Sequence, residues 1–475
     1  MATHLEADIC VIGAGSGGLS VAAGAAQLGA RTVLIESGRM GGDCLNYGCV
    51  PSKSLLAAAH QAVAHREGGA LGVFYAPPRV DWDLARAHVR RAIAAIAPHD
   101  SVARFEALGV TVIAASARFV DPATVVAGDY RVTARRFVLA TGSSPAVPPI
   151  PGLETVPYLT NETIFDVAGP IRHLLVIGGG PIGAELAQAH ARLGARVTVL
   201  EMARLLPQDD PDLVATVRAS LIRDGVTLFE GARVIDVARH NDEIQVNFAG
   251  ANGIASAVSG SHLLLATGRR PNLEALDLAA AGIAATARGV TVDAHLRSSN
   301  RRVYAVGDCA GGPAFTHVAG YHAGIVIRNI LFRLPARTDY RALPRVTYTD
   351  PELAAAGLGE AEARRLWPDC TVTEAGFAEN DRAQTEGETT GRIKVISRRN
   401  GRILGVALVG PGAGELLAPW CLALGRGMKL SALAGAVFPY PTRGEISKAA
   451  AGRFYTPKLF SPWVRRLVGF LLRLP

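Results

Sequence analysis

The chain has 475 residues, which at roughly 100–200 residues per domain predicts about three domains. Hydrophobic residues make up 49% of it and charged residues 19%, which excludes a disordered chain, and six cysteines are too few for a disulfide-stapled scaffold. The net charge of +8 is too mild to indicate a nucleic-acid partner. We therefore expect a globular, cytoplasmic protein in which any disulfide is catalytic.

The stretch from residue 9 to residue 30 has no charged side chain and is long enough to cross a bilayer. The residues before it include Glu6 and Asp8, whereas the segment that precedes the apolar core of a signal peptide is basic. Six glycines also interrupt the stretch. We therefore exclude a membrane span and a signal peptide here and interpret the stretch as part of a folded, glycine-rich unit.

A unit of strand, glycine turn, helix and strand occurs twice along the chain. Residues 8–12 and 174–177 are short apolar runs typical of buried strands, and a glycine-rich turn and an alanine-rich helix follow each of them. The turns contain Gly13, Gly15 and Gly18 in the first copy and Gly178, Gly180 and Gly183 in the second. The next strand ends in Glu36 or Glu201, 23 positions after the first glycine in both copies. The repeat predicts two domains of the same kind.

The end of the unit recurs as well. Residues 137–142 and 263–268 are apolar strands that end in Ala-Thr-Gly, which makes Thr141, Gly142 and Gly268 candidate ligand contacts. Residues 302–308 then predict a strand that returns to the first domain, and alternating segments after residue 343 predict an antiparallel sheet. We predict an α/β fold with two Rossmann-like dinucleotide-binding domains, the second inserted in the first, and a third α+β domain. The expected boundaries are 1–150 and 273–342 for the two parts of the first domain, 151–272 for the second, 343–453 for the third and 454–475 for a C-terminal tail.

The glycine turn and the carboxylate together are typical of dinucleotide binding. The glycines allow close approach to a pyrophosphate, the helix N-terminus offers N–H groups, and the carboxylate accepts a hydrogen bond from a ribose 2′-hydroxyl. One such turn is weak support, but two complete copies make coincidence improbable. Because a carboxylate repels a 2′-phosphate, Glu201 favours NAD over NADP, and Arg204, three residues later, could offset part of that repulsion.

Segment 41–53 contains a pair of cysteines. Cys44 and Cys49 are separated by four residues and precede an Ala/Leu-rich helix that we expect from Ser52 to about His65. A thiol at a helix N-terminus has a lowered pKa and is stabilised as the thiolate. Metal ligation would need a second Cys/His pair, and none lies nearby, so we expect a redox pair and no resident metal.

This segment resembles the redox-active disulfide motif of the flavin-dependent pyridine nucleotide–disulfide oxidoreductases, a family that includes dihydrolipoamide dehydrogenase, glutathione reductase and mercuric reductase. The resemblance extends over nearly the whole chain. It implies FAD at residues 13–36, with further contacts from Gly42 and Asp308, and NAD at residues 178–201. It also implies a homodimer in which the third domain completes the active site across the interface.

The resemblance implies a role for each residue of the redox centre. NADH delivers a hydride to the flavin, near which Lys53 pairs with Glu185; the alternative is that Glu185 caps a surface helix turn. Cys49 faces the flavin, and Cys44 is the interchange thiol that attacks a substrate disulfide. The expected enzyme passes electrons between NADH, FAD and the Cys44–Cys49 disulfide and on to a dithiol/disulfide substrate, as dihydrolipoamide dehydrogenase does.

One position departs from that pattern. Tyr440, in a Pro-Tyr-Pro-Thr segment followed by Glu445, stands where dihydrolipoamide dehydrogenase and glutathione reductase have an acid–base histidine, and it resembles the mercuric reductase branch. However, mercuric reductases usually end in a vicinal cysteine pair, and no cysteine follows Cys421 here. Two acceptor classes therefore stay open: a disulfide, or a non-thiol acceptor such as a metal ion or a quinone. Another histidine could also take over the missing role: His60, His317 or His322.

The last residues combine basic and apolar side chains. Residues 463–474 follow Pro462, and on a helical wheel of 100° per residue Arg465, Arg466 and Arg473 share one arc while the large apolar side chains lie outside it. That pattern is similar to an interfacial membrane helix and predicts a peripheral contact with the inner face of the membrane. The alternative is docking onto the dimer or onto the chain's own domains.

Overall fold

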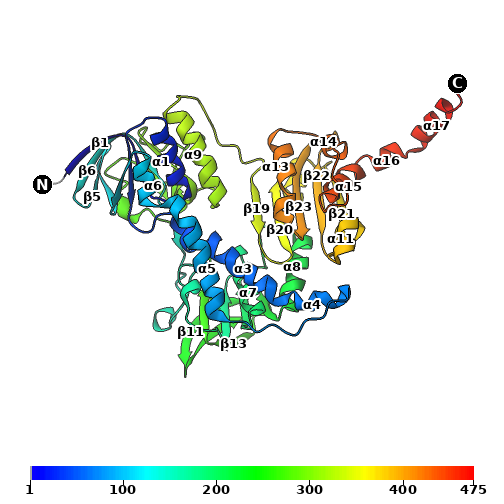
Figure 1. Ribbon diagram of the computed structural model, residues 1–475, viewed down its shortest axis with the longest axis horizontal. Helices are drawn as coiled ribbons and strands as arrows, with labels where there is room; N and C mark the ends of the chain where they lie inside the picture. The colour runs from blue at the N-terminus through cyan, green and yellow to red at the C-terminus, as the bar shows by residue number, and fades with distance from the viewer. Residues whose placement is uncertain (1–2) are drawn as a thin grey trace.

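The computed structural model describes residues 3–475, which are arranged around three main sheets. Two of these sheets are largely parallel and covered by helices, and the third is antiparallel (Figure 1). The predicted class, two Rossmann-like domains with an additional α+β domain, is confirmed. Among the described residues, no helix is both long enough and apolar enough to cross a membrane.

The first unit is a seven-stranded sheet with helices packed against it. Its elements are β1 (Thr3–Ile12), α1 (Ser16–Gln27), β2 (Thr32–Glu36), α2 (Gly42–Asn46), α3 (Cys49–Val63), α4 (His65–Gly68), α5 (Trp82–Ile96), α6 (Val102–Ala107), β3 (Val110–Ala114), β4 (Ala117–Asp121), β5 (Thr124–Ala127), β6 (Tyr130–Leu139), β16 (Ala285–Thr286), β17 (Gly289–Val290), β18 (Val303–Ala305) and α9 (Thr316–Ile330). The strand order is β3-β2-β1-β6-β5-β4, and β18 pairs in parallel with β6. Because β18 comes from a segment after the second unit, that unit is inserted within the first.

The second unit repeats the strand–turn–helix–strand pattern of the first. Its elements are β8 (His173–Ile177), α7 (Pro181–Arg192), β9 (Arg196–Glu201), α8 (Pro211–Arg223), β10 (Val226–Glu230), β11 (Arg233–His240), β12 (Glu243–Ala249), β13 (Ala255–Gly260) and β14 (His262–Leu265). Strands β10-β9-β8-β14 form a parallel sheet, and β11-β12-β13 form an antiparallel one. Two short strands, β7 (Ser143–Pro145) and β15 (Arg269–Pro271), pair where the chain crosses between the units.

The third unit is a five-stranded antiparallel sheet in the order β19-β20-β23-β22-β21, with helices beside it. Its elements are β19 (Pro344–Thr347), β20 (Glu352–Gly357), α10 (Glu360–Leu366), β21 (Thr371–Gly376), α11 (Asp381–Glu386), β22 (Arg392–Ser397), β23 (Ile403–Gly410), α12 (Ala413–Leu416), α13 (Ala418–Gly425), α14 (Leu430–Ala434) and α15 (Glu445–Arg453). Two more helices, α16 (Thr456–Leu459) and α17 (Pro462–Leu471), extend away from the sheet toward the C-terminus (Figure 1).

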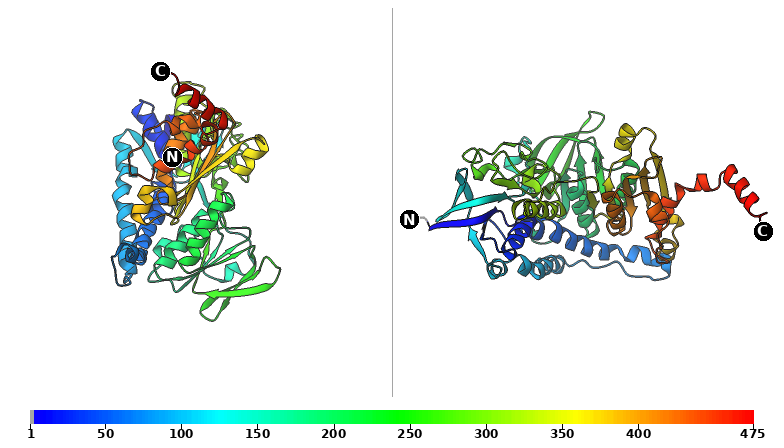
Figure 2. Two further views of the ribbon diagram at one scale, coloured as in Figure 1. Left: turned by 90° about the vertical axis from the view of Figure 1, so that its right-hand side faces the viewer. Right: turned by 90° about the horizontal axis from the view of Figure 1, so that it is seen from above.

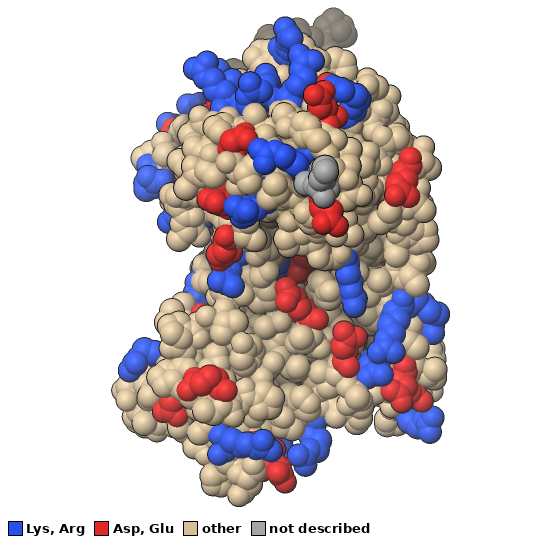
Figure 3. Space-filling model, turned by 90° about the vertical axis from the view of Figure 1, so that its left-hand side faces the viewer, with Lys and Arg blue, Asp and Glu red and all other residues tan. Residues whose placement is uncertain are grey.

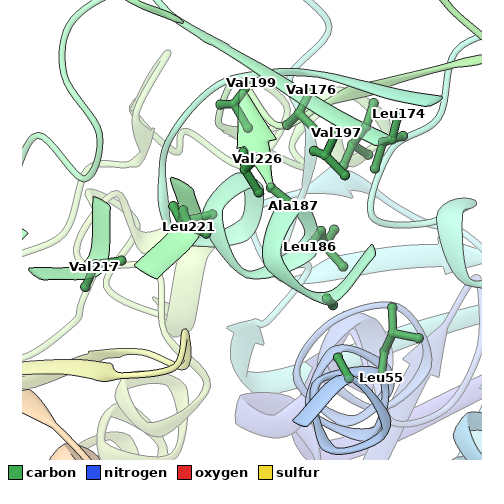
Figure 4. Packing of buried hydrophobic residues seen from close by; sticks show 14 of the residues in the cluster. Leu55, Leu174, Val176, Leu186, Ala187, Val197, Val199, Val217, Leu221 and Val226 are labelled. Carbon is green, nitrogen blue, oxygen red and sulfur yellow. The ribbon is translucent and has the colours of Figure 1, made fainter. Parts of the chain in front are cut away.

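Helix α3 of the first unit packs against α7 of the second. Leu55 of α3 is 4% exposed and belongs to the same buried cluster as Leu186 and Ala187 of α7. Figure 4 shows Leu55 on the side of α7 that carries Leu186. Burial of these apolar side chains favours contact between the two helices. Lys53 and Glu185 lie on the same two helices, so this contact brings a residue of the cysteine segment next to the second glycine turn.

The helix after the cysteine pair begins earlier than the sequence predicts. It begins at Cys49 rather than Ser52, and the N–H of Ser52 donates to the carbonyl of Gly48 at 3.1 Å. Pro51 therefore lies in the first turn, where a missing N–H breaks no helical hydrogen bond. Cys44 lies in the separate short helix α2, so the two cysteines lie on consecutive helices.

Candidate active site

A cavity of about 1000 Å³ lies between the three units and brings most of the predicted site residues together. The predicted residues that line it are Gly13, Gly15, Glu36, Gly42, Cys44, Cys49, Lys53, Thr141, Gly142, Glu185 and Asp308. Those outside its lining are Gly18, Gly178, Gly180, Gly183, Glu201, Gly268, Tyr440 and Glu445. On the face shown in Figure 3 a hollow separates two lobes, and side chains of both charges lie around it.

The first glycine turn has the close backbone approaches that a dinucleotide needs. Gly13 has φ +105°, and a Cβ there would lie 2.3 Å from the carbonyl oxygen of Ala140. A Cβ on Gly18 would lie 1.8 Å from the oxygen of Gly13, so neither position tolerates a side chain. Around Gly15, at the N-terminus of α1, no atom lies within 4 Å of a built Cβ. This open backbone edge at a helix N-terminus fits the pyrophosphate of FAD.

The carboxylate at the end of β2 is held in place by the turns beside it. Glu36 accepts hydrogen bonds from the N–H of Ala14 at 2.5 Å and of Gly38 at 2.6 Å. A Cβ on Gly42 would lie 2.7 Å from the Cα of Gly15, so the cysteine segment approaches the glycine turn as closely as glycine allows. These residues form one wall of the cavity and fit a bound dinucleotide.

The second turn has the same geometry. Gly178 has φ +111°, and a Cβ there would lie 2.3 Å from a carbonyl oxygen of the strand end that follows β14. Glu201 accepts from the N–H of Gly179 at 2.5 Å and of Ala203 at 2.7 Å, which matches the arrangement around the first carboxylate. Arg204 donates to the carbonyls of Pro207 and Asp209 at 2.7 and 2.8 Å, so backbone oxygens already bind one nitrogen of its guanidinium group.

The cysteines are both thiols in this structure, and their environments differ. A hydrogen bond from Cys44 stabilises the thiolate of Cys49, and despite the opposing effect of burial the pKa of the Cys49 thiol falls to about 6. The hydroxyl of Thr316 at 3.6 Å and the charge of Lys53 contribute to this shift. The pKa of the Cys44 thiol is raised by that hydrogen bond and by burial. The arrangement therefore favours a thiolate at Cys49 and a protonated thiol at Cys44.

Lys53 and Glu185 form an ion pair across the α3–α7 contact. The ammonium nitrogen lies 2.7 Å from Glu185 Oε2, and the Glu185 side chain is 6% exposed. The alternative that Glu185 caps a surface helix turn is therefore wrong. Tyr348, which belongs to the third unit, contacts both members of this ion pair. Its N–H donates to Glu185 Oε1 at 2.9 Å, and its ring centre lies 4.4 Å from Lys53 Nζ.

A polar network links several of the residues that line the cavity. The hydroxyl of Ser143 donates to Asp308 at 2.5 Å, and Arg269 donates to the hydroxyl of Ser143 at 2.7 Å. Arg269 also forms an ion pair with Asp43, next to Cys44, at 3.1 Å. The hydroxyl of Thr141 donates to a backbone carbonyl at 2.7 Å. The network joins both parts of the first unit to the cysteine segment.

Tyr440 and Glu445 lie in the third unit, and this chain does not bring them to its own cysteine pair. The Tyr440 side chain is 71% exposed, and its hydroxyl donates to Asp381 at 2.9 Å. That hydrogen bond and the negative charge of Asp381 raise the pKa of Tyr440 above its usual range. Glu445 accepts from the N–H of Thr442 at 3.4 Å.

The three histidines proposed as replacements differ in their surroundings. His322 accepts from the N–H of Gly307 at 3.1 Å, its other ring nitrogen lies 2.7 Å from the Tyr340 hydroxyl, and burial lowers its pKa to about 4. His60 lies 3.3 Å from Asp350. His317 lines the cavity, and burial lowers its pKa.

Sequence reasoning missed three residues of the site: Thr316, Tyr348 and Arg269. Each reaches the cysteine segment from a distant part of the chain, and none belongs to a motif that is recognisable by local spacing. What the sequence offers is their place beside predicted elements: Thr316 comes after the returning strand, and Arg269 directly follows the second Ala-Thr-Gly.

Comparisons with known proteins cover almost the whole chain. Residues 7–323 match the pyridine nucleotide-disulphide oxidoreductase family, and residues 343–451 match the dimerisation domain of that family. A mercuric reductase from Lysinibacillus sphaericus is 33% identical over 450 residues, which cover 94% of this chain and 82% of that protein. A dihydrolipoyl dehydrogenase from Geobacillus stearothermophilus is 33% identical over 461 residues, with coverage of 94% and 96%. A solved Cu(II) complex of the HOCl-induced flavoprotein disulfide reductase RclA from Escherichia coli has a TM-score of 0.85 at 27% identity and covers 94% of this chain and 99% of its own.

Proposed function

Because the chain belongs to the pyridine nucleotide-disulphide oxidoreductase family, we propose that Cys44 and Cys49 carry electrons from its cofactors to an external acceptor. The chain is a flavin-dependent enzyme that uses FAD and a nicotinamide dinucleotide, and its dimerisation domain makes it a homodimer. The observation that carries the proposal is the shared cavity: the cysteine pair, the Lys53–Glu185 ion pair and the first glycine turn line one space.

Each nucleotide has a separate set of residues to hold it. For FAD these are Gly13, Gly15, Gly18, Glu36, Gly42, Lys53, Thr141, Gly142 and Asp308. For NAD they are Gly178, Gly180, Gly183, Glu201 and Gly268. Bound there, FAD supplies two-electron transfer between the nicotinamide and the cysteine pair.

The residues of the chain then handle the sulfur chemistry. When the Cys44–Cys49 disulfide accepts two electrons, its S–S bond breaks, Cys44 takes a proton, and Cys49 becomes a thiolate stabilised by the hydrogen bond from Cys44 and by the charge of Lys53. Cys44, once deprotonated, attacks a substrate disulfide: a mixed disulfide forms, and the released thiolate takes a proton. Cys49 then attacks Cys44, which releases the second substrate thiol and restores the internal disulfide.

Anaerobic titration of the FAD-loaded enzyme with NADH tests the proposal. The wild type should accept twice as many electrons per subunit as the Cys49→Ser variant, since that variant has no disulfide to reduce. Equal uptake by the two proteins would overturn the redox role of the pair. The reduced enzyme, mixed with oxidised lipoamide, oxidised glutathione, Cu(II), Hg(II) or a quinone, then identifies the acceptor class by the rate of reoxidation.

A second candidate is a reductase of a non-thiol acceptor, such as a metal ion or a quinone. The observation that favours it is the hydrogen bond from Tyr440 to Asp381, because a phenol whose pKa is raised above about 10 is a poor base at neutral pH. Disulfide exchange needs a group beside the substrate that accepts and donates a proton. Transfer of electrons to a soft metal ion depends less on such a group.

We also propose that the protein is cytoplasmic and makes a peripheral contact with the inner face of the membrane through residues 463–474. The support is that this segment is helical over Pro462–Leu471 and has no buried side chain within the helix. Sedimentation of the enzyme with lipid vesicles, compared with a chain truncated after Phe460, tests this contact.

A further inference from the structure

The tail, defined here as residues 456–475, projects from the third unit. Figure 1 and the right-hand view of Figure 2 show α16 and α17 extending beyond the sheet to the C-terminus. Neither helix has a buried side chain, whereas Phe454, just before them, is 7% exposed and belongs to the core of the third unit. The alternative that the tail docks onto its own chain is therefore wrong for this structure.

The two sides of α17 differ in chemistry. Trp463 and Phe470 are 69% and 60% exposed and point to the same side of a helical wheel. Arg465 and Arg466, with Arg473 two residues after the end of the helix, lie in a separate 100° arc of the wheel that borders Phe470 and holds none of the large apolar side chains. Within residues 3–475 none of the three arginines has an ion-pair partner. A helix with an exposed apolar face beside an arc of unpaired arginines is typical of segments that bind at the boundary between lipid headgroups and acyl chains.

The positive charge of the tail indicates a negatively charged partner. It contains Lys458 and three arginines and no aspartate or glutamate, so its side chains are attracted to a negative surface. The match to the family's dimerisation domain ends at residue 451, before the tail begins. We propose that the tail binds the surface of a bilayer that contains anionic phospholipids, an inference that rests on the membrane contact proposed above.

The dimensions of α17 fit binding along the surface. Its 10 residues span about 15 Å, about half the thickness of a hydrocarbon core. In this orientation Trp463 and Phe470 enter the acyl boundary, and the arginines contact phosphate groups. The homodimer carries two tails, so binding by one raises the effective concentration of the other.

The test is co-sedimentation of the FAD-loaded homodimer with vesicles of phosphatidylcholine alone or of phosphatidylcholine mixed with phosphatidylglycerol. Full-length protein should bind the mixed vesicles, and R465Q/R466Q/R473Q should bind about a hundredfold more weakly, at about fivefold for each arginine. R79Q/R135Q/R365Q is the matched control, because it removes three charges from side chains that are 92%, 74% and 72% exposed. The control should bind like the wild type, and NADH turnover with a soluble acceptor should be the same in all variants.

Three results would contradict the inference in different ways. Equal binding to both kinds of vesicle would refute the preference for anionic lipid and leave the membrane contact standing. If the full-length chain binds vesicles no more strongly than the chain truncated after Phe460, both the membrane contact and the preference for anionic lipid are refuted. The redox proposal is not affected by that result. Conversion of the truncated homodimer to monomers in analytical ultracentrifugation would show that the tail covers the partner subunit instead.

Discussion

Among individual residues, Cys44 has the largest effect on Cys49, because its S–H group donates the hydrogen bond that stabilises the thiolate. Cys44→Ser keeps a donor at that position, so the pKa of Cys49 should stay near 6, whereas Cys44→Ala removes the donor and should move the pKa toward the ordinary value of about 8.5. A lowered pKa means that the thiolate persists down to lower pH. The rate of iodoacetamide alkylation against pH measures the midpoint, and equal midpoints in the two variants would contradict the role of this hydrogen bond.

In our proposal Tyr440 is the residue that determines the acceptor class. General acid–base catalysis typically contributes about 10²–10⁴-fold, and a phenol that donates to Asp381 cannot supply it near neutral pH. Tyr440→His should therefore raise the rate of dihydrolipoamide oxidation with NAD at least tenfold, and Tyr440→Phe should not. If wild type and Tyr440→His oxidise dihydrolipoamide equally fast, another residue supplies the proton transfer, and His317 at the cavity wall is the first to replace.

Among the elements, we predict that the turn between β8 and α7 and the end of β9 set the choice between NADH and NADPH. Glu201 lies next to the turn, and Arg204, which could bind a 2′-phosphate, donates to two backbone carbonyls instead. A hydrogen bond from the ribose 2′-hydroxyl of NADH to the Glu201 carboxylate contributes about 1.5–3 kcal/mol. We therefore expect kcat/KM to be about one to two decades higher with NADH than with NADPH. Glu201→Ala should narrow the gap, and a wild type that uses NADPH equally well would contradict this reading.

The elements also show what the sequence could and could not reveal. The repeated turns were predictable, because close packing of Gly13 and Gly178 against a strand end needs glycine at fixed local spacing. Contacts between distant segments were not: Thr316 reaches Cys49 across 267 positions, and Tyr348 reaches Glu185 across 163. Such pairs follow from how whole units pack, and no local pattern records them.

In the whole molecule, the buried Arg192 of the second unit forms an ion pair with the third unit. Arg192 is 5% exposed and forms ion pairs at 2.7 Å with Asp224 and with Asp350. Arg192→Leu would leave the buried Asp224 with less compensation and should lower the free energy of unfolding by about 3 kcal/mol. Asp350→Asn should cost about 1 kcal/mol or less, because Asp350 is 42% exposed. Urea denaturation followed by circular dichroism measures the free energy of unfolding of both variants. Equal losses of stability would show that the burial of the replaced side chain does not determine the effect.

The contact between α3 and α7 has a consequence for how the enzyme takes up its nicotinamide nucleotide. Many proteins close around a ligand by rotation of one domain about a hinge. Here the first unit, which carries the cysteines, and the second unit are joined by the contact of Leu55 with Leu186 and by the Lys53–Glu185 ion pair. A rotation between the lobes would expose apolar side chains and separate that pair. We therefore expect nucleotide exchange to proceed without such a rotation, through rearrangement of side chains that line the cavity, such as Ile182, which is 37% exposed.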